Sequence, residues 1–131
     1  MGLYTAAALL PEHPQAGAWR KTGWQWMNHC FQQQIAADGT YIQHSLNYHR
    51  LMLQLALWAR CIARSQEQLL PPQSQERLGA ATMWLLERLD ARSGRVPNLG
   101  HNDGAYILPL AAGGFADYRP TAQAASRAFL G

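Results

Sequence analysis

The stretch SLNYHRLMLQLALWARCIARSQ, residues 45–66, decides the fold. Large apolar residues recur along it at every third or fourth position, namely Tyr48, Met52, Leu55, Trp58 (or Ala59) and Ile62. This spacing is that of one face of an α-helix. Ser45 stands where a helix prefers an N-cap side chain. We therefore expect a helix from about Ser45 to Gln66 with this apolar stripe buried.

The first 44 residues carry the same helical spacing between turn formers. A short apolar segment, Leu3 to Leu10, is followed by the helix-breaking sequence PEHP at residues 11–14. A second helix is expected from Ala16 to Gln34. Its predicted buried face holds Trp19, Trp26 and Cys30, with Gly23 and Met27 between them. Asp38-Gly39 then marks a tight turn.

The second half of the chain predicts further helices. Pro71-Pro72 ends the long helix, and Ser74 is expected to cap a third one that holds its period through Leu89 and stops before Ser93-Gly94. The sequence PNLGHNDG at residues 97–104 is typical of a loop. A short apolar helix is expected over residues 105–110, and a last one from Pro120 to Phe129. Because no segment alternates as a strand does, we predict an all-α fold of antiparallel helical hairpins.

The composition fits a folded domain that has part of its surface covered. The chain has 131 residues, of which 48% are hydrophobic and 15% are charged. An average domain has about 25% charged residues. This length is typical of one domain, so residues 1–131 are expected to form a single helical domain. The low charged fraction suggests that some of its surface is normally covered.

The sequence argues against several classes of protein. The net charge is +3, and the basic residues are scattered rather than gathered in a stripe, which argues against nucleic-acid binding. No apolar run is long enough for a membrane span, and no basic residue precedes the apolar start, unlike a secretory signal. Cys30 and Cys61 form no CxxC pair, so we expect no metal site, and no cofactor motif is present.

Polar residues gather in three places, each directly before a predicted helix. They are residues 38–50, residues 98–105 and residues 117–120. If the hairpins lie side by side, these helix N-termini meet at one rim, where backbone N–H groups favour an anionic ligand. A plainer interpretation stays open for each of them. Tyr48 fits a core tyrosine equally well, His44 and His49 fit ordinary polar positions, and the Asp-Gly pairs are turn formers.

Three motifs resemble the heparinase II/III family. DGTYIQHSLNYHRLML at residues 38–53 is similar to its signature, in which an Asp-Gly turn precedes a Ser and a Tyr-His pair that opens a helix. PNLGHNDGAYILPL at residues 97–110 and DYRPTAQAA at residues 117–125 resemble later family segments in the same order. The resemblance implies a slice of an incomplete α/α toroid, which in the family is followed by a β-sandwich.

The resemblance also implies a function. Family members cleave uronate-containing polysaccharides by β-elimination, so an acidic polysaccharide is the expected partner, no cofactor is expected, and the periplasm or the exterior is the implied location. Tyr48 matches the tyrosine that acts as general base and acid. A helix N-terminus favours its anionic form, whereas burial opposes it. The substrate-binding residues implied by the motifs are His49, Arg50, Asn102, Asp103 and Arg119.

One family element is missing from the expected place. The Asn-His motif that neutralises the sugar carboxylate would precede Met1, and Asn28-His29 lies in the wrong helix to replace it. The later catalytic histidine and the β-sandwich would follow Gly131. We therefore expect a partial toroid that is inactive by itself. A sugar-binding module without activity and a truncated helical protein with a structural or self-associating role are the alternatives.

The apolar ends suggest self-association. Residues that neighbouring toroid helices would otherwise cover are expected to lie exposed and to pair with another copy, which predicts a homo-oligomer. These residues are Leu3, Tyr4, Leu9, Leu10, Phe129 and Leu130.

Overall fold

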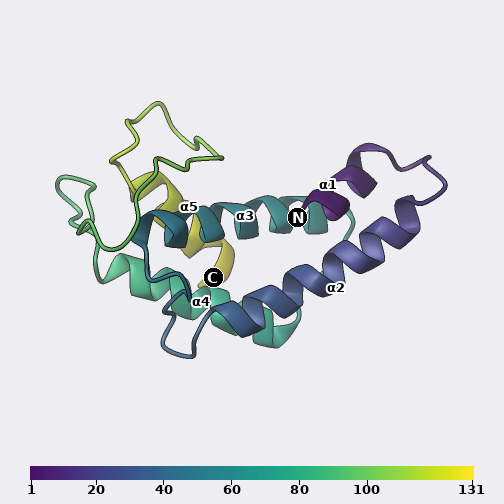
Figure 1. Ribbon diagram of the computed structural model, residues 1–131, viewed down its shortest axis with the longest axis horizontal. Helices are drawn as coiled ribbons and strands as arrows, with labels where there is room; N and C mark the ends of the chain where they lie inside the picture. The colour runs from purple at the N-terminus through teal and green to yellow at the C-terminus, as the bar shows by residue number, and fades with distance from the viewer.

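Five α-helices joined by loops make up the protein, and the computed structural model describes all of residues 1–131 (Figure 1). The helices are α1 (Gly2–Leu9), α2 (Ala16–Gln34), α3 (Leu46–Ser65), α4 (Pro72–Leu86) and α5 (Arg119–Phe129). The single β feature is an isolated bridge between Ile35 and Tyr41. The prediction of an all-α fold is therefore confirmed.

Consecutive long helices run antiparallel. In Figure 1, α2 runs toward the left, α3 returns to the right, and α4 runs left again below α3. α1 packs on α2 and reaches α3, whereas α5 packs on α3 and α4. One hydrophobic core joins these elements and draws residues from every helix, among them Tyr4, Phe31, Leu53, Leu78 and Phe129.

The buried face of α3 differs from the predicted stripe. Met52 and Ala59 are buried, but Tyr48, Leu55 and Ile62 are only partly covered, and Trp58 is 41% exposed. The face that packs inward instead carries Leu46, His49, Arg50, Leu53, Ala56, Ala59 and Ala63. Its alanines allow neighbouring helices to approach closely, a role that a search for large apolar residues overlooks. The predicted cap is confirmed, because Ser45 Oγ accepts a hydrogen bond of 3.2 Å from Tyr48 N.

The buried face of α2 is also rotated from the prediction. Gly23, Met27 and Phe31 face inward at four-residue spacing, whereas Trp26 is 64% exposed. Gly23 explains the rotation, because a Cβ added there would lie 2.7 Å from the backbone nitrogen of Tyr4. The absence of a side chain brings α1 onto this face of α2.

Two other predicted elements are corrected. α4 begins at Pro72, and Ser74 is no cap but is buried inside the helix, where it accepts a hydrogen bond of 3.1 Å from Gln32 Nε2. Residues 105–110 form no helix. The side chain of Gln54 bonds to the backbone of Ile107 and Leu108, and these bonds take the place of helical ones.

His49 is a buried histidine with one unmet polar atom. Its ring stacks on Trp84 of α4 with centroids 4.7 Å apart, and it is 1% exposed. Nε2 lies 2.8 Å from the Ala81 carbonyl oxygen and must donate to it, since a carbonyl only accepts. Nδ1 has no partner. Burial lowers the pKa of His49 from 6.5 to about 4, because the charged ring would lose its hydration.

This lowered pKa predicts a loss of stability in mild acid. In the unfolded chain His49 binds a proton below pH 6.5, whereas in the folded chain it stays neutral down to about pH 4. The contribution of His49 to the free energy of unfolding is thus fully present above pH 6.5. It is lost as the pH falls from 6.5 to about 4, by on the order of 3 kcal/mol in total. Urea unfolding at a series of pH values measures it. His49→Phe should flatten the dependence, whereas the exposed-site control His29→Gln should keep it. An unchanged slope in His49→Phe would assign the effect to other groups.

Candidate functional site

The start of α3 is where two loops meet. Residues 35–45 lead into it, and part of the long loop between α4 and α5 lies against it (Figure 1). Leu46 N donates to the Leu99 carbonyl at 3.0 Å, and Ser45 Oγ donates to the His101 carbonyl at 2.5 Å. Gly100 has a φ of +71°, and a Cβ there would collide with the His44 carbonyl. Residues 98–105 are therefore held against residues 38–50, as we predicted for two segments on a common rim.

Tyr48 and Asp103 form the centre of this region. The Tyr48 hydroxyl donates a hydrogen bond of 2.5 Å to Asp103 Oδ2. This bond, followed by partial burial and the carboxylate charge, raises the pKa of Tyr48 above its usual value of 10. The same bond, followed by one from Ala105 N, lowers the pKa of Asp103. The stable pair is a neutral phenol and an ionised carboxylate, so Asp103 outweighs the helix N-terminus that favours a phenolate.

Asn47 and Arg50 extend this pair into the interior. Asn47 Nδ2 donates to Asp103 Oδ1 at 3.2 Å. Arg50 in turn donates to Asn47 Oδ1 at 2.9 Å. Asn47 is 2% exposed and Arg50 is 0% exposed. A chain of four hydrogen-bonded side chains thus runs from the buried guanidinium of Arg50 to the phenol at the surface.

Arg50 is enclosed by aromatic rings rather than by carboxylates. Its guanidinium carbon lies 4.7, 4.2 and 4.1 Å from the ring centres of Tyr106, Phe115 and Tyr118. Arg50 also donates to the Phe115 carbonyl. Burial lowers the pKa of Arg50, and the ring faces offset part of that penalty through cation–π attraction.

Gln54, one turn beyond Arg50, holds the same loop at a second point. It is 0% exposed. Its amide nitrogen donates to the Leu108 carbonyl at 3.1 Å and to Thr121 Oγ1 at 3.3 Å. Its oxygen accepts from Ile107 N at 3.2 Å and from Leu108 N at 3.4 Å. Every hydrogen-bonding position of this side chain is therefore used to fix the loop and α5.

The remaining residues implied by the resemblance lie in different surroundings. His49 and Arg50 are buried, so neither reaches a ligand at the surface. Asn102 is exposed beside Asp103, and its amide donates to Asn98 Oδ1 at 3.3 Å. Arg119 forms a two-bond ion pair with Asp117, at 2.9 and 2.8 Å, and no hydrogen bond or ion pair joins it to Tyr48 or Asp103. The structure thus brings together Tyr48, Asp103 and Asn102 at the surface, with Arg50 behind them.

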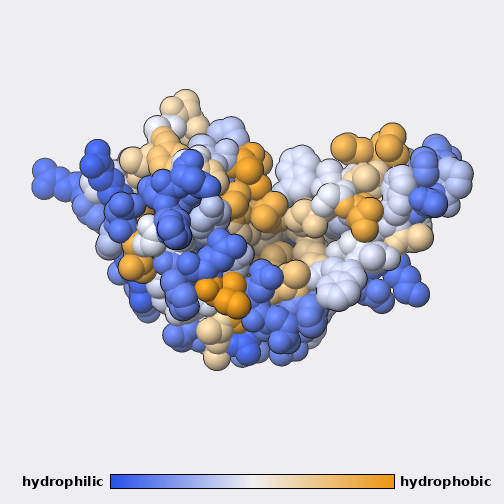
Figure 2. All heavy atoms as spheres, in the orientation of Figure 1, coloured by the Kyte–Doolittle hydropathy of each residue, from blue (hydrophilic) through white to orange (hydrophobic).

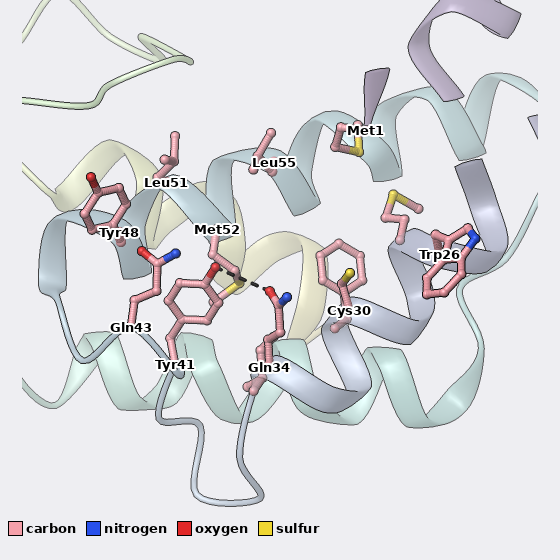
Figure 3. A pocket seen from close by; sticks show the side chains of 13 residues that line it. Met1, Trp26, Cys30, Gln34, Tyr41, Gln43, Tyr48, Leu51, Met52 and Leu55 are labelled. Carbon is pink, nitrogen blue, oxygen red and sulfur yellow. Dashed lines mark hydrogen bonds between the residues drawn. The ribbon is translucent and has the colours of Figure 1, made fainter. Parts of the chain in front are cut away.

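An apolar groove lies next to Tyr48, between α2 and α3. It has a volume of about 400 Å³, and Figure 2 shows apolar atoms in the hollow between the two helices. Tyr48 stands at one end of it and Trp26 at the other, with Leu51 and Leu55 on the α3 side and Cys30 and Gln34 on the α2 side (Figure 3). Eleven of its thirteen lining residues are hydrophobic, and none has a charged side chain. The groove therefore suits an apolar partner rather than an acidic one.

The structure shows no arrangement of side chains for a metal site, no disulfide and no membrane-spanning helix. No group of three or more His, Cys, Asp or Glu side chains is placed to hold a metal ion. Cys30 and Cys61 are both free thiols. None of the five helices combines the length and the apolar character that crossing a bilayer requires.

Comparison with known families adds an independent observation. The family profile described as Heparinase II/III N-terminus matches residues 1–100. The chain belongs to the heparinase II/III family. No curated protein and no solved structure matches it. The match to the heparinase II/III profile includes Tyr48 and its whole helix but ends just before His101, Asn102 and Asp103.

The motifs predicted Tyr48 together with Arg50, Asn102 and Asp103, but they gave no role to Asn47 or Gln54. Asn47 bonds to Asp103, Gln54 fixes the loop that carries Asp103, and both lie inside a helix whose apolar spacing drew attention to other positions. One signal was available. Polar residues at positions 47, 50 and 54 recur every three or four residues, so they mark a second, polar stripe on α3.

The role of Gln54 predicts a local loss of order. Gln54→Ala removes four hydrogen bonds to residues 107, 108 and 121 and leaves backbone groups unpaired, at a cost of roughly 1–3 kcal/mol or more. Hydrogen exchange should accelerate at the Ile107 and Leu108 amides before it does in α2. Gln33→Ala, at an exposed position of α2, is the matched control and should change neither. Unchanged protection of the 105–110 segment in Gln54→Ala would show that other contacts hold the loop.

Proposed function

We propose that this chain forms part of a lyase that cleaves uronate-containing acidic polysaccharide by β-elimination. The observation that carries the proposal is the placement of Tyr48, whose proton is held at the surface against an ionised Asp103. Membership of the heparinase II/III family supports it. The periplasm or the exterior of the cell is the location that goes with this function.

The reaction moves one proton off the sugar and one proton onto it. The base removes the proton on C5 of the uronate, and the electrons of that bond form the C4=C5 double bond. The bond from C4 to the bridging oxygen then breaks, and the departing oxygen takes a proton. Tyr48 is a neutral donor in this arrangement, so the acid step is the one for which it is prepared. For Tyr48 to act as the base as well, Asp103 has to move away or accept its proton first.

A proton next to a carboxylate leaves readily only if that carboxylate is neutralised. The arginines implied by the family motifs do not meet this need within residues 1–131. Arg50 is buried, and Arg119 is paired with Asp117. His101 is exposed, and its electrostatic effect on the pKa of Asp103 is a minor one, so it does not replace these arginines. We therefore propose that residues 1–131 alone are inactive.

Turnover tests this proposal directly. Incubated with heparan sulfate, chondroitin, alginate or mixed acidic exopolysaccharides, residues 1–131 should release little or no unsaturated uronate, measured by its ultraviolet absorbance. The same residues within a longer heparinase II/III protein should release it. Tyr48→Phe there should lower turnover by at least about 100-fold, because the proton donor is lost.

Tyr41→Phe is the matched control for this test. The Tyr41 hydroxyl bonds weakly to Gln34, at 3.5 Å, so its loss should leave turnover unchanged. Strong activity of residues 1–131 alone would contradict the account of the carboxylate. Binding of the polymer by the longer protein without any turnover would favour the sugar-binding module instead.

We also propose that the chain self-associates through its apolar surface. Leu3, Leu9, Leu10 and Leu130 are 45%, 72%, 54% and 43% exposed. Tyr4 and Phe129, expected at the same surface, are instead in the core, at 0% and 4% exposed. Each large apolar side chain left in water forgoes roughly 1.5–3 kcal/mol relative to burial. These leucines, together with the groove, supply apolar area for a second copy.

Sedimentation at micromolar concentration checks this expectation. The chain should sediment as a dimer or a larger species, and Leu9→Glu or Leu130→Glu should shift it toward the monomer. Leu110→Glu, at a leucine of similar exposure in the long loop, should leave the assembly intact. A monomer at all accessible concentrations would refute self-association.

A further inference from the structure

We propose that Arg50 is a positioning residue, which acts through Asn47 and the loop between α4 and α5 to hold Asp103 as the hydrogen-bond acceptor of the Tyr48 hydroxyl. Its meaning for catalysis rests on the function proposed above. The geometry itself is testable without any turnover.

The setting of Arg50 is unusual for an arginine. Buried guanidinium groups are normally paired with a carboxylate, yet the ion pairs of the structure are Arg88 with Glu87 and Arg119 with Asp117. The partners of Arg50 are instead three ring faces, the Phe115 carbonyl and the Asn47 amide. Its Nε has no partner. Because Arg50 is fully buried, it cannot act as a surface charge, and its role has to lie in the groups that it contacts.

Arg50 dictates which way the Asn47 amide points. A guanidinium has five donors and no acceptor, so only the oxygen of Asn47 can face it. The amide nitrogen is thereby turned toward Asp103, to which it donates at 3.2 Å. A flipped amide would set Nδ2 against the guanidinium and Oδ1 against the carboxylate, both of which repel. The orientation of Asn47 is therefore fixed by Arg50 and not by Asp103 alone.

Arg50 also holds the segment that carries Asp103. The rings of Tyr106, Phe115 and Tyr118 all lie on the guanidinium, and all three are on the loop that contains Asp103, with Tyr118 as its last residue before α5. With one Asp103 oxygen occupied by Asn47 and Ala105 N, the other oxygen remains for Tyr48. The titratable group that acts on the phenol is Asp103, and His101 contributes a minor effect on Asp103. Loosening Arg50 should therefore loosen the acceptor of the phenol.

The titration of Tyr48 reads out this coupling. Tyrosines labelled with ¹³C at Cζ are followed by NMR as the pH is raised, and Tyr48→Phe assigns the Tyr48 signal. In the native chain Tyr48 should ionise above the usual pH of 10. Asp103→Asn should bring its pKa down toward that value. Arg50→Lys, which keeps the positive charge but not the fork of donors, should produce at least half of the same decrease.

Arg119→Lys is the matched control, because Arg119 is bonded to Asp117 and not to this chain of groups. It should leave the Tyr48 titration unchanged. If Arg50→Lys fails to fold, as judged by circular dichroism, Asn47→Leu tests the same link while keeping Arg50 and its rings.

Two outcomes would overturn the proposal. One is a Tyr48 pKa equal to that of the native chain in folded Arg50→Lys or Asn47→Leu, while Asp103→Asn lowers it. The other is an equal decrease in Arg119→Lys, which would show a general electrostatic effect. A titration as expected in a longer protein without lyase activity would refute the proposed function and leave the positioning role intact.

Discussion

Asn47, His49, Arg50 and Gln54 lie on the first turns of α3 with almost none of their surface exposed. A buried polar group without a partner is costly, so each needs a hydrogen-bonding group from elsewhere in the chain. α4 supplies one of these to His49 through the Ala81 carbonyl. The loop between α4 and α5 supplies the others through Asp103, Phe115, Ile107 and Leu108. This need for partners orders a long segment that has no helix of its own.

The same constraint explains which parts of the fold were predictable from sequence. Helix α2 was predicted to the residue, and α3, α5 and the Ser45 cap were predicted closely, because turn formers and local hydrogen bonds define them. The helix expected over residues 105–110 was wrong because Gln54, some fifty residues earlier, takes over its backbone groups. Sequence periodicity reflects only residues close together along the chain, so it cannot predict a hydrogen-bond partner this far away in sequence.

The candidate site was predictable in part for a related reason. Tyr48 was found through a motif, and its neighbours along the chain came with it. The common rim predicted that the segment of Asp103 lies near Tyr48. The direct bond between the two side chains depends on the φ of Gly100 and on the bond from Ser45 to the His101 carbonyl, which no spacing rule reveals. The inward direction of His49 and Arg50 was equally hidden, because a polar residue beside a motif residue is normally taken to share its surface. Helical geometry separates adjacent residues by about 100° around the axis, so Tyr48 and His49 face different environments.

The position of Tyr48 also separates two kinds of surface. On one side lies a groove lined by hydrophobic side chains and without charge. On the other lies a polar rim with Asp103 and Asn102. An acidic polymer gains nothing from the groove, since its carboxylates would lose water without gaining a partner. If the chain binds the acidic polymer proposed above, the rim is the surface that suits it, whereas the groove suits an apolar protein surface. Because the phenol stands at the boundary, covering the groove would exclude water from one side of Tyr48 and strengthen its bond to Asp103. Packing at the groove and the proton transfer proposed for the rim would in this way be coupled through one side chain.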